Sequence, residues 1–320
     1  MFRRDGDSYL LSTKKKKTKW QTGSAQERAD IVNDAIAKNQ EYEIRFDMIS
    51  VDTEEDVTPD LVLPGIYRLF NGSYSKPESL DVQTISERNY PNFPEAFDSL
   101  DTELKWFKDN KDFFSGIGIR RSRSVLLWGP PGYSKTAKIH DLVLKNPDML
   151  VIFMVAPPSH KMVEALNNIK LDKIIIFEEF ATAVNNDSKI SAMLNFLDGD
   201  NSLNDAFFII TTNHPEIIPR NVLRPSRIDK FIKIDKLSNT DIENFLKFYL
   251  KRDVDAEEVT LMKGQSLANL REICISSLKE GKGLGDAIKI LKTREELMKK
   301  DFASPKKVGL TSEDDDDFPY

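Results

Sequence analysis

Residues 124–136 have the sequence Ser-Val-Leu-Leu-Trp-Gly-Pro-Pro-Gly-Tyr-Ser-Lys-Thr, and this stretch decides the fold. It begins with an apolar run that is typical of a buried strand, and helical spacing of apolar residues begins at Lys135. Between the two lies the glycine- and proline-rich segment Gly129–Gly132. A turn of this kind, followed at once by a helix, directs several backbone amides at one anion. The sequence therefore predicts a phosphate-binding loop, and the alternative is a structural turn with an incidental lysine.

The side chains of this loop suit a nucleoside triphosphate bound together with Mg²⁺. Lys135 would bridge the β- and γ-phosphates, and the hydroxyl of Thr136 would ligate the metal. Ser134 stands where the usual pattern has its second glycine, so a tight backbone must tolerate a Cβ there. We therefore expect ATP and Mg²⁺ as ligands. The expected nucleotide-binding residues are Gly129, Pro130, Pro131, Gly132, Tyr133, Ser134, Lys135, Thr136 and Ala137.

A second apolar run, Ile174–Phe177, ends in the paired carboxylates of Glu178 and Glu179. At the end of a strand, one such carboxylate can face the metal while its neighbour polarises an attacking water. We assign Glu178 to Mg²⁺, through a bridging water, and Glu179 to the role of general base. Aspartate is usual at the first position, so Glu178 adds a methylene. The alternative is that both glutamates cap a following helix, where acidic residues are favoured.

Apolar runs and helical segments alternate from Phe97 to Leu237. Near-continuous apolar strands separated by helices are typical of an α/β fold, with a parallel sheet covered on both faces. After Leu237 the strands stop and helical periodicity continues, so we expect a C-terminal helical lid. The predicted strands are residues 124–128, 149–155, 173–177, 207–211 and 230–234, and the predicted helices are residues 100–107, 135–145, 161–170, 241–250, 267–278 and 284–298.

The first 96 residues carry different signals. Ser24 and Glu27 form a capping-box pair before a helical stretch at residues 24–39, and residues 42–48 alternate apolar and polar side chains as a strand does. Ile66–Phe70 is a further apolar run that enters an Asn-Gly turn, and three prolines then favour a boundary before residue 97. The expected division is a basic arm (1–23), a small β-containing adaptor domain (24–96), the nucleotide-binding αβα domain (97–236), the helical lid (237–300) and an acidic tail (301–320).

Composition and charge narrow the classes of function. The chain of 320 residues has a single cysteine, Cys274, and three histidines, which provide neither an intramolecular disulfide nor a closed zinc site. No run approaches the ~18 apolar residues of a membrane helix, so we expect a cytoplasmic protein with no membrane contact. The net charge is −6, although residues 1–20 hold seven basic residues. An acidic body argues against a surface coated with nucleic-acid-binding charge, and a local DNA contact stays open.

Two further polar segments complete a series of four motifs. Asn213 ends the apolar run that begins at Phe207, and Leu223-Arg-Pro-Ser-Arg-Ile-Asp229 follows at a turn. In this order, GPPGYSKT, IIIFEE, TTN and LRPSRID resemble the motifs of the classical AAA ATPases over residues 97–280. The resemblance implies a P-loop AAA+ fold with an αβα sheet, a helical lid and hydrolysis of ATP.

The resemblance also implies roles for the last two motifs. Asn213 would position the attacking water, and Arg224 and Arg227 would be fingers inserted into the nucleotide of a neighbouring subunit. Arginines supplied across a subunit boundary neutralise charge on the γ-phosphate only after assembly. A homo-oligomer, specifically a hexameric ring, is the expected state. Gly264–Arg271 resembles the lid segment that contacts adenine and ribose in this family, and a solvated Arg271 is the alternative.

Within the family, the sequence is most similar to the group that places the Rieske protein into respiratory complex III, together with its microbial and phage relatives. Residues 107–132 and 193–229 carry this likeness. That group also has glutamate at the first carboxylate position. Its membrane anchor and its N-terminal domain find no match in this sequence, so a respiratory role is not carried over.

Three segments bear on the partner. The loop expected at Ala156–Met162 lacks the aromatic residue with which AAA unfoldases grip a polypeptide, which leaves substrate threading open. Residues 311–320 end in Phe-Pro-Tyr after five acidic residues, and they resemble the acidic tips of single-stranded-DNA-binding proteins, which dock on replication enzymes. A replication-protein partner is one hypothesis, and a solvating tail is the alternative. The lysines of residues 14–19, beside Trp20, are a candidate DNA contact.

We therefore expect an ATP-hydrolysing ring that remodels or disassembles a protein or protein–DNA complex, with a link to replication as one hypothesis. The alternative is a nucleotide-dependent DNA-binding or assembly switch with slow turnover. The presence of Glu179, Asn213 and both arginines favours turnover.

Overall fold

The chain divides into two compact units, Met1–Asp241 and Ile242–Tyr320. The computed structural model describes residues 2–5, 8–12, 17–21, 43–44, 64–70, 79–83, 85, 93–184, 186–199 and 201–302. The helix predicted at residues 24–39, the Asn-Gly turn at 71–72 and the acidic segment 311–320 lie outside the described residues.

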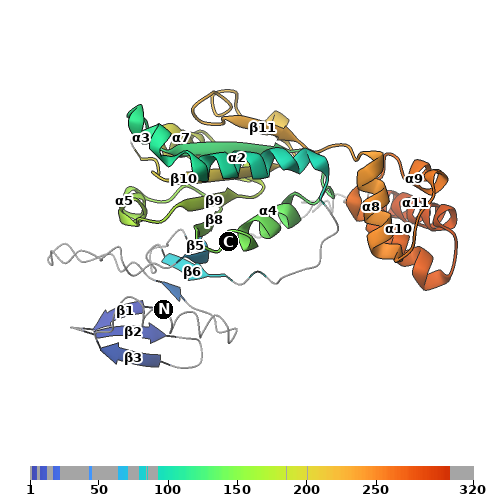
Figure 1. Ribbon diagram of the computed structural model, residues 1–320, viewed down its shortest axis with the longest axis horizontal. Helices are drawn as coiled ribbons and strands as arrows, with labels where there is room; N and C mark the ends of the chain where they lie inside the picture. The colour runs from blue at the N-terminus through green and yellow to red at the C-terminus, as the bar shows by residue number, and fades with distance from the viewer. Residues whose placement is uncertain are drawn as a thin grey trace, which may run out of the picture. The chain divides into compact units, whose positions relative to one another are not determined.

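A mixed, largely parallel sheet forms the centre of the first unit (Figure 1). Its order is β11-β7-β10-β9-β8-β5-β6, in which neighbours from β11 to β5 are parallel and β6 is antiparallel to β5. Hydrogen bonding continues from β6 through β4, β1, β2 and β3. The predicted α/β fold is confirmed. The strands are β1 (Phe2–Asp5), β2 (Ser8–Ser12), β3 (Lys17–Gln21), β4 (Glu43–Ile44), β5 (Gly65–Phe70), β6 (Ser79–Val82), β7 (Ser122–Trp128), β8 (Leu150–Met154), β9 (Lys173–Phe177), β10 (Ala206–Thr212) and β11 (Lys230–Lys233).

Helices cover both faces of this sheet, because successive strand residues point to opposite sides. On one face, Leu104 of α2 and Ile139 of α4 belong to one apolar core. On the other face, Leu166 of α5 and Phe196 of α7 belong to a second core. The helices of this unit are η2 (Glu95–Phe97), α2 (Asp98–Asp109), α3 (Lys111–Gly116), α4 (Lys135–Leu144), α5 (His160–Asn168), α6 (Phe180–Ala183), α7 (Asp187–Asp198) and η3 (Pro215–Ile217).

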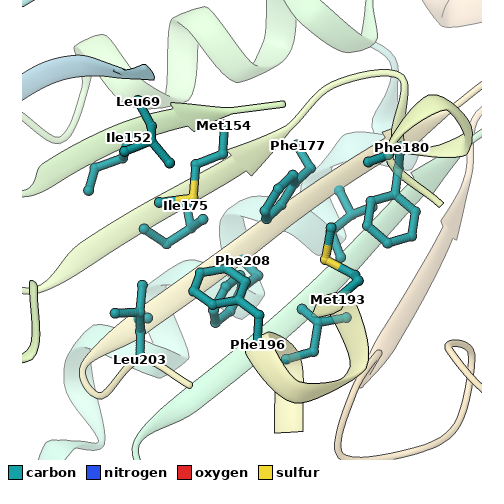
Figure 2. Close-up of a cluster of buried hydrophobic side chains, with 14 of the residues drawn as sticks. Leu69, Ile152, Met154, Ile175, Phe177, Phe180, Met193, Phe196, Leu203 and Phe208 are labelled. Atoms are coloured by element: carbon teal, nitrogen blue, oxygen red, sulfur yellow. The ribbon is translucent and has the colours of Figure 1, made fainter. Parts of the chain in front are cut away.

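The second core contains a row of aromatic rings (Figure 2). Phe196 meets Phe177 and Phe208 edge to face, with ring centroids 6.1 and 5.6 Å apart. All three rings are fully buried. Burial of each such side chain contributes roughly 1.5–3 kcal/mol relative to an exposed one. Because Phe177 directly precedes Glu178, this packing fixes the strand end that carries the paired carboxylates.

The described residues of the C-terminal part contain helices and no strand. Its helices are α8 (Asn239–Leu250), α9 (Ala256–Leu261), α10 (Leu267–Glu280) and α11 (Leu284–Phe302). Asp255 begins α9 with a capping box that it shares with Glu258. Gly281 ends α10 in the left-handed region, with φ of 62°. No helix in the described part of the chain combines the length and the apolar character needed to cross a membrane.

Strand β5 differs from the sequence expectation. We predicted Ile66–Phe70 as part of a separate N-terminal domain, yet β5 pairs in parallel with β8 in the central sheet. The reason is that Tyr67 and Leu69 are buried in one core of the sheet and Ile66 packs against the other, although Arg68 and Phe70 are exposed. In the described part of the chain, its antiparallel partner is Ser79–Val82. The sheet therefore begins before the boundary that the prolines suggested.

The basic arm expected at residues 1–23 also differs. It contains β1, β2 and β3, which pair as an antiparallel meander with Arg4 opposite Tyr9 and Leu10 opposite Lys19. Helices α3, α6, α7 and α9 were not predicted either. Helices of about one to three turns carry too little periodicity to stand out in one sequence.

A buried guanidinium joins the amino-terminal ends of three strands. Arg121, which precedes β7, is 6% exposed and lies 4.1 Å over the ring of Phe107. It donates to both carboxylate oxygens of Asp172, at 2.6 and 2.9 Å, and to Asp205 at 3.0 Å. Asp172 directly precedes β9 and Asp205 directly precedes β10. One side chain therefore holds the starts of β7, β9 and β10 together.

We predict that Arg121→Ala destabilises the sheet by about 3 kcal/mol, the lower part of the range for breaking a buried pair, because both aspartates keep some exposure. Urea titration followed by circular dichroism measures this loss. The control is Lys105→Ala, which removes an exposed pair with Asp109 and should change the free energy of unfolding by less than about 1 kcal/mol. Equal losses in the two variants would contradict a structural role for the Arg121 cluster.

Candidate nucleotide-binding site

Parallel pairing brings the carboxyl ends of β7, β9 and β10 to one edge of the sheet. Trp128 lies opposite Thr212, and Phe177 lies opposite Ile210. Ligands of open α/β sheets bind at this edge, beyond the carboxyl ends of the strands. The loop after β7, the two glutamates after β9 and Asn213 after β10 therefore gather where a ligand would bind.

The first glycine holds the loop tightly against the sheet. Gly129 has a φ of 149°, and a Cβ there would lie 2.0 Å from the carbonyl oxygen of Ile234. Its amide donates to the carbonyl of Thr212 at 3.3 Å. Gly132 also has a positive φ, of 84°. Only glycine meets the close approach at Gly129, so the path of the loop is fixed by β10 and by the residue after β11.

Ser134 adopts the backbone conformation that a glycine would have at its position. Its φ of 63° and ψ of 26° are left-handed, and its side chain makes no capping hydrogen bond to α4. A non-glycine residue in this region costs about 1–2 kcal/mol. The loop therefore keeps its path with a Cβ at this position. Because the residue is serine and not glycine, its backbone is strained. The neighbouring Tyr133 packs its ring into the core, so its backbone alone faces the loop.

Lys135 lies at the start of α4, and its side chain is folded into the loop. Only 8% of the residue is exposed. Its Nζ donates to the carbonyl oxygens of Gly129 and Pro130 at 2.7 and 2.9 Å, and to Oδ1 of Asn213 at 2.7 Å. Burial lowers the pKa of Lys135, and the negative charge of Glu179 partly offsets that effect. The ammonium is thus enclosed and has an acceptor for each of its three protons.

Asn213 connects the lysine to the catalytic candidate. Its Nδ2 donates to Oε1 of Glu179 at 2.6 Å, while its Oδ1 accepts from Lys135. This amide orientation is the one that works, because an ammonium only donates and a carboxylate only accepts. Glu179 itself is left-handed, with φ of 52°, and its amide donates to the hydroxyl of Thr211 at 3.3 Å. The structure therefore brings three predicted residues from three elements into one hydrogen-bonded group.

Glu178 has a buried carboxylate oxygen that is available to a metal ion. Its Oε1 is buried, and it has no hydrogen-bond partner among the described residues. An unpaired buried carboxylate oxygen is costly unless a cation or a water satisfies it. No group of three or more His, Cys, Asp or Glu side chains suited to a metal occurs in the described part of the chain. A cation held by Glu178 and the hydroxyl of Thr136 would therefore complete its shell with phosphate and water, which suits Mg²⁺.

The two predicted finger arginines lie outside this group. Arg224 is exposed, and Arg227 is partly buried against its own chain. Among the described residues, no hydrogen bond or ion pair joins either guanidinium to Lys135, Asn213 or Glu179. Both arginines therefore stand apart from the group formed by Lys135, Asn213 and Glu179.

Two supporting residues were missed from the sequence. The hydroxyl of Thr211 holds the amide of Glu179, and the carboxylate of Asp229 accepts from the amide of Ser124 at 2.8 Å. A polar residue at a strand end gives a weak signal in one sequence, because such positions are often only solvated. The TTN and LRPSRID motifs contained both residues, so attention to every polar member of the motifs would have found them.

Comparison with known proteins agrees with this geometry. Residues 125–236 match the family described as ATPase family associated with various cellular activities (AAA). The ATPase family gene 2 protein of Schizosaccharomyces pombe is 26% identical over 185 residues, which are 52% of this chain and 23% of that protein. The 26S proteasome regulatory subunit 10B homolog A of Arabidopsis thaliana is 28% identical over 193 residues, covering 52% of this chain and 48% of that protein.

The Ribosome biogenesis ATPase RIX7 of Saccharomyces cerevisiae is 29% identical over 175 residues, which are 46% of this chain and 21% of that protein. The chain thus spans less than half the length of each of these three relatives. The matched region begins within β7 and ends just after β11, so it contains the loop, both glutamates, Asn213 and both arginines. The segment that holds the candidate site, residues 125–236, therefore resembles the ATPase domain of the AAA family.

Proposed function

We propose that this chain hydrolyses ATP in the presence of Mg²⁺ and, as a ring of identical subunits, remodels or disassembles a protein or protein–DNA complex. The observation that carries the proposal is the hydrogen-bonded group of Lys135, Asn213 and Glu179, next to a loop with the backbone of a phosphate cradle. A loop, a lysine and a polarised carboxylate are the parts that phosphoryl transfer to water requires.

Each residue of the site has a role in this proposal. Lys135 exchanges its loop carbonyls for phosphate oxygens when ATP binds. Asn213 orients the attacking water, and Glu179 accepts its proton. Glu178 and Thr136 would hold Mg²⁺, which supplies charge neutralisation at the phosphates. Finally, Arg224 reaches the nucleotide of the neighbouring subunit, so that turnover depends on assembly.

The relatives support the remodelling part of the proposal. Their names include a regulatory subunit of the 26S proteasome and an ATPase of ribosome biogenesis. A hexameric ring, a cytoplasmic location and the likeness to the Rieske-protein translocases stay predictions. So do a DNA contact and a replication-protein partner, whose candidate segments, residues 14–19 and 311–320, fall largely or wholly outside the described residues.

We predict that Lys135→Ala abolishes ATP binding, whereas Glu179→Gln keeps ATP bound and lowers its hydrolysis by about 100- to 10,000-fold. The reason is that the lysine contacts phosphate and the glutamate handles a proton. Fluorescent-nucleotide titration and phosphate release measure the two effects. Exposed Lys145→Ala and Glu164→Gln are the matched controls and should behave as the wild type. Turnover by Glu179→Gln at the wild-type rate would mean that another group is the base.

A mixing experiment tests action between subunits. Arg224→Ala and Glu179→Gln should each be nearly inactive alone, and a mixture should regain activity. Roughly a quarter of the boundaries in a randomly mixed cyclic ring then combine an intact glutamate with an intact arginine. The control pair uses Arg220→Ala, another exposed arginine, which should be active before mixing. A fully active monomer in light scattering would refute the ring.

The strain at Ser134 yields a stability prediction. Ser134→Gly should raise the free energy of unfolding by about 0.5–1 kcal/mol, since relief of the left-handed strain exceeds the added entropy of a glycine in the unfolded chain. Ser134→Ala keeps the Cβ and should leave stability nearly unchanged. Thermal denaturation without nucleotide compares the three proteins. A loss of stability in the glycine variant would show that the hydroxyl, rather than the backbone, decides the conformation of this position.

A further inference from the structure

We propose that the two arginines of the Leu223–Asp229 segment have different roles. Arg224 is the residue presented to the neighbouring subunit, and Arg227 is a positioning residue that anchors the segment within its own subunit through Asp198. This inference rests on the proposed ATPase function and goes beyond it, because the motif alone treats both arginines as fingers.

The guanidinium of Arg227 is already engaged by its own chain. Its Nη1 donates to the carbonyl oxygen of Asn221 at 2.6 Å, and its Nε lies 3.7 Å from Oδ2 of Asp198. The side chain is 22% exposed. To reach a phosphate of another subunit, this guanidinium would have to leave a short hydrogen bond and a carboxylate that is its ion-pair partner. Such an exchange costs more than the use of an arginine that is unpaired.

Asp198 holds the segment at two points. It is the last residue of α7, and its Oδ2 also accepts a hydrogen bond from the hydroxyl of Ser226 at 2.9 Å. Ser226 has a φ of 76°, a left-handed value that a serine adopts only when its surroundings enforce it. The carboxylate of Asp198 therefore fixes both the tight turn and the arginine that follows it.

The backbone of the segment is fixed from the sheet. The amides of Arg227 and Ile228 both donate to the carbonyl of Arg224, at 3.1 Å each, which closes a turn. The hydroxyl of Ser124 in β7 donates to the carbonyl of Arg227 at 2.5 Å. The turn is thus held from β7 on one side and from α7 on the other, and Arg224 stands at its beginning.

Arg224 contrasts with Arg227 in every respect that matters for action between subunits. It is exposed, and its guanidinium makes no ion pair or hydrogen bond with any side chain or backbone group that the structure describes. A long side chain whose base is fixed and whose charged end is unpaired can reach an anion without first breaking contacts. The geometry therefore leaves Arg224 able to reach an anion of the neighbouring subunit, while Arg227 holds the turn in place.

The anchor lies on an element that packs beside the catalytic glutamates. Phe196, two residues before Asp198, packs on Phe177 with ring centroids 6.1 Å apart, and Phe177 directly precedes Glu178. Figure 2 shows these rings on facing elements of the same core. The segment that presents Arg224 is therefore tied to the helix that covers the end of β9.

Amide hydrogen exchange on the nucleotide-free protein tests the anchor without any assay of activity. Exchange in the peptide that contains residues 223–229 should become at least several-fold faster in Arg227→Ala and in Asp198→Ala. It should keep its wild-type rate in Arg224→Ala. The matched control is Asp187→Ala, which removes an exposed carboxylate from the other end of α7 and should leave this peptide unchanged. Wild-type exchange in both Arg227→Ala and Asp198→Ala would overturn the proposal.

Steady-state ATP hydrolysis gives the second test. Arg227→Ala, Asp198→Ala and the double variant should lower kcat by the same factor, about ten- to a hundredfold, with KM for ATP unchanged, because all three loosen one turn. Arg224→Ala should lower kcat by about a thousandfold or more. Equal thousandfold losses for both arginines, with full activity in Asp198→Ala, would make Arg227 a second finger and overturn the proposal. A wild-type protein without ATPase activity would refute the proposed function, and the exchange experiment would still decide the anchor.

Discussion

Parallel pairing of β7, β10 and β9 is the constraint on which the site depends. Polar residues follow each of these strands at the same edge of the sheet, and the register of the strands sets how far each polar segment extends beyond that edge. A shift of one residue would turn every strand side chain to the opposite face, and would bury Glu178 or Asn213 in apolar surroundings. The two apolar cores on the faces of the sheet prevent such a shift, since they fix the alternation of Ile174 to Phe177. The packing of apolar side chains in the two cores thereby determines how the polar residues of the candidate site are arranged.

Arg121 and Lys135, two buried cations at opposite edges of the sheet, differ in their hydrogen-bond acceptors. At the amino edge, Arg121 is held by hydrogen bonds to two aspartates. Lys173, at the same edge, resembles Lys135 instead, because it donates to the neutral carbonyls of Ile169 and Leu171 at 3.0 Å each. Burial lowers the pKa of Lys173 to about 8, and nearby aspartates offset part of that effect. At the carboxyl edge, the acceptors of Lys135 include two neutral loop carbonyls and the amide of Asn213. Phosphate oxygens readily replace neutral acceptors around a cation, whereas they do not readily replace the carboxylates that bind Arg121.

The sequence allowed prediction of the elements whose signals are local. β9 matches its predicted range, and the loop, the glutamates and Asn213 stand at the predicted strand ends, because an apolar run followed by a polar tip is a short-range pattern. The apolar run Ile66–Phe70 was recognised, but the place of β5 in the central sheet escaped prediction, because its partner, β8, is distant in the chain. The contrast between Arg224 and Arg227 escaped for the same reason. It depends on Asp198, in a helix that the sequence analysis did not find.

The three acceptors around Lys135 have a consequence for the rate at which a nucleotide enters the site. An ammonium that is buried without other partners would become an uncompensated buried charge whenever the ligand leaves, and that would slow each cycle. Here the lysine can exchange its hydrogen bonds one at a time from a carbonyl oxygen to a phosphate oxygen, so the charge always keeps an acceptor. The loop carbonyls act as a temporary solvation shell that the protein supplies from its own backbone. Under the proposed function, exchange of ATP for its product would therefore not require the electrostatic work of exposing a bare cation.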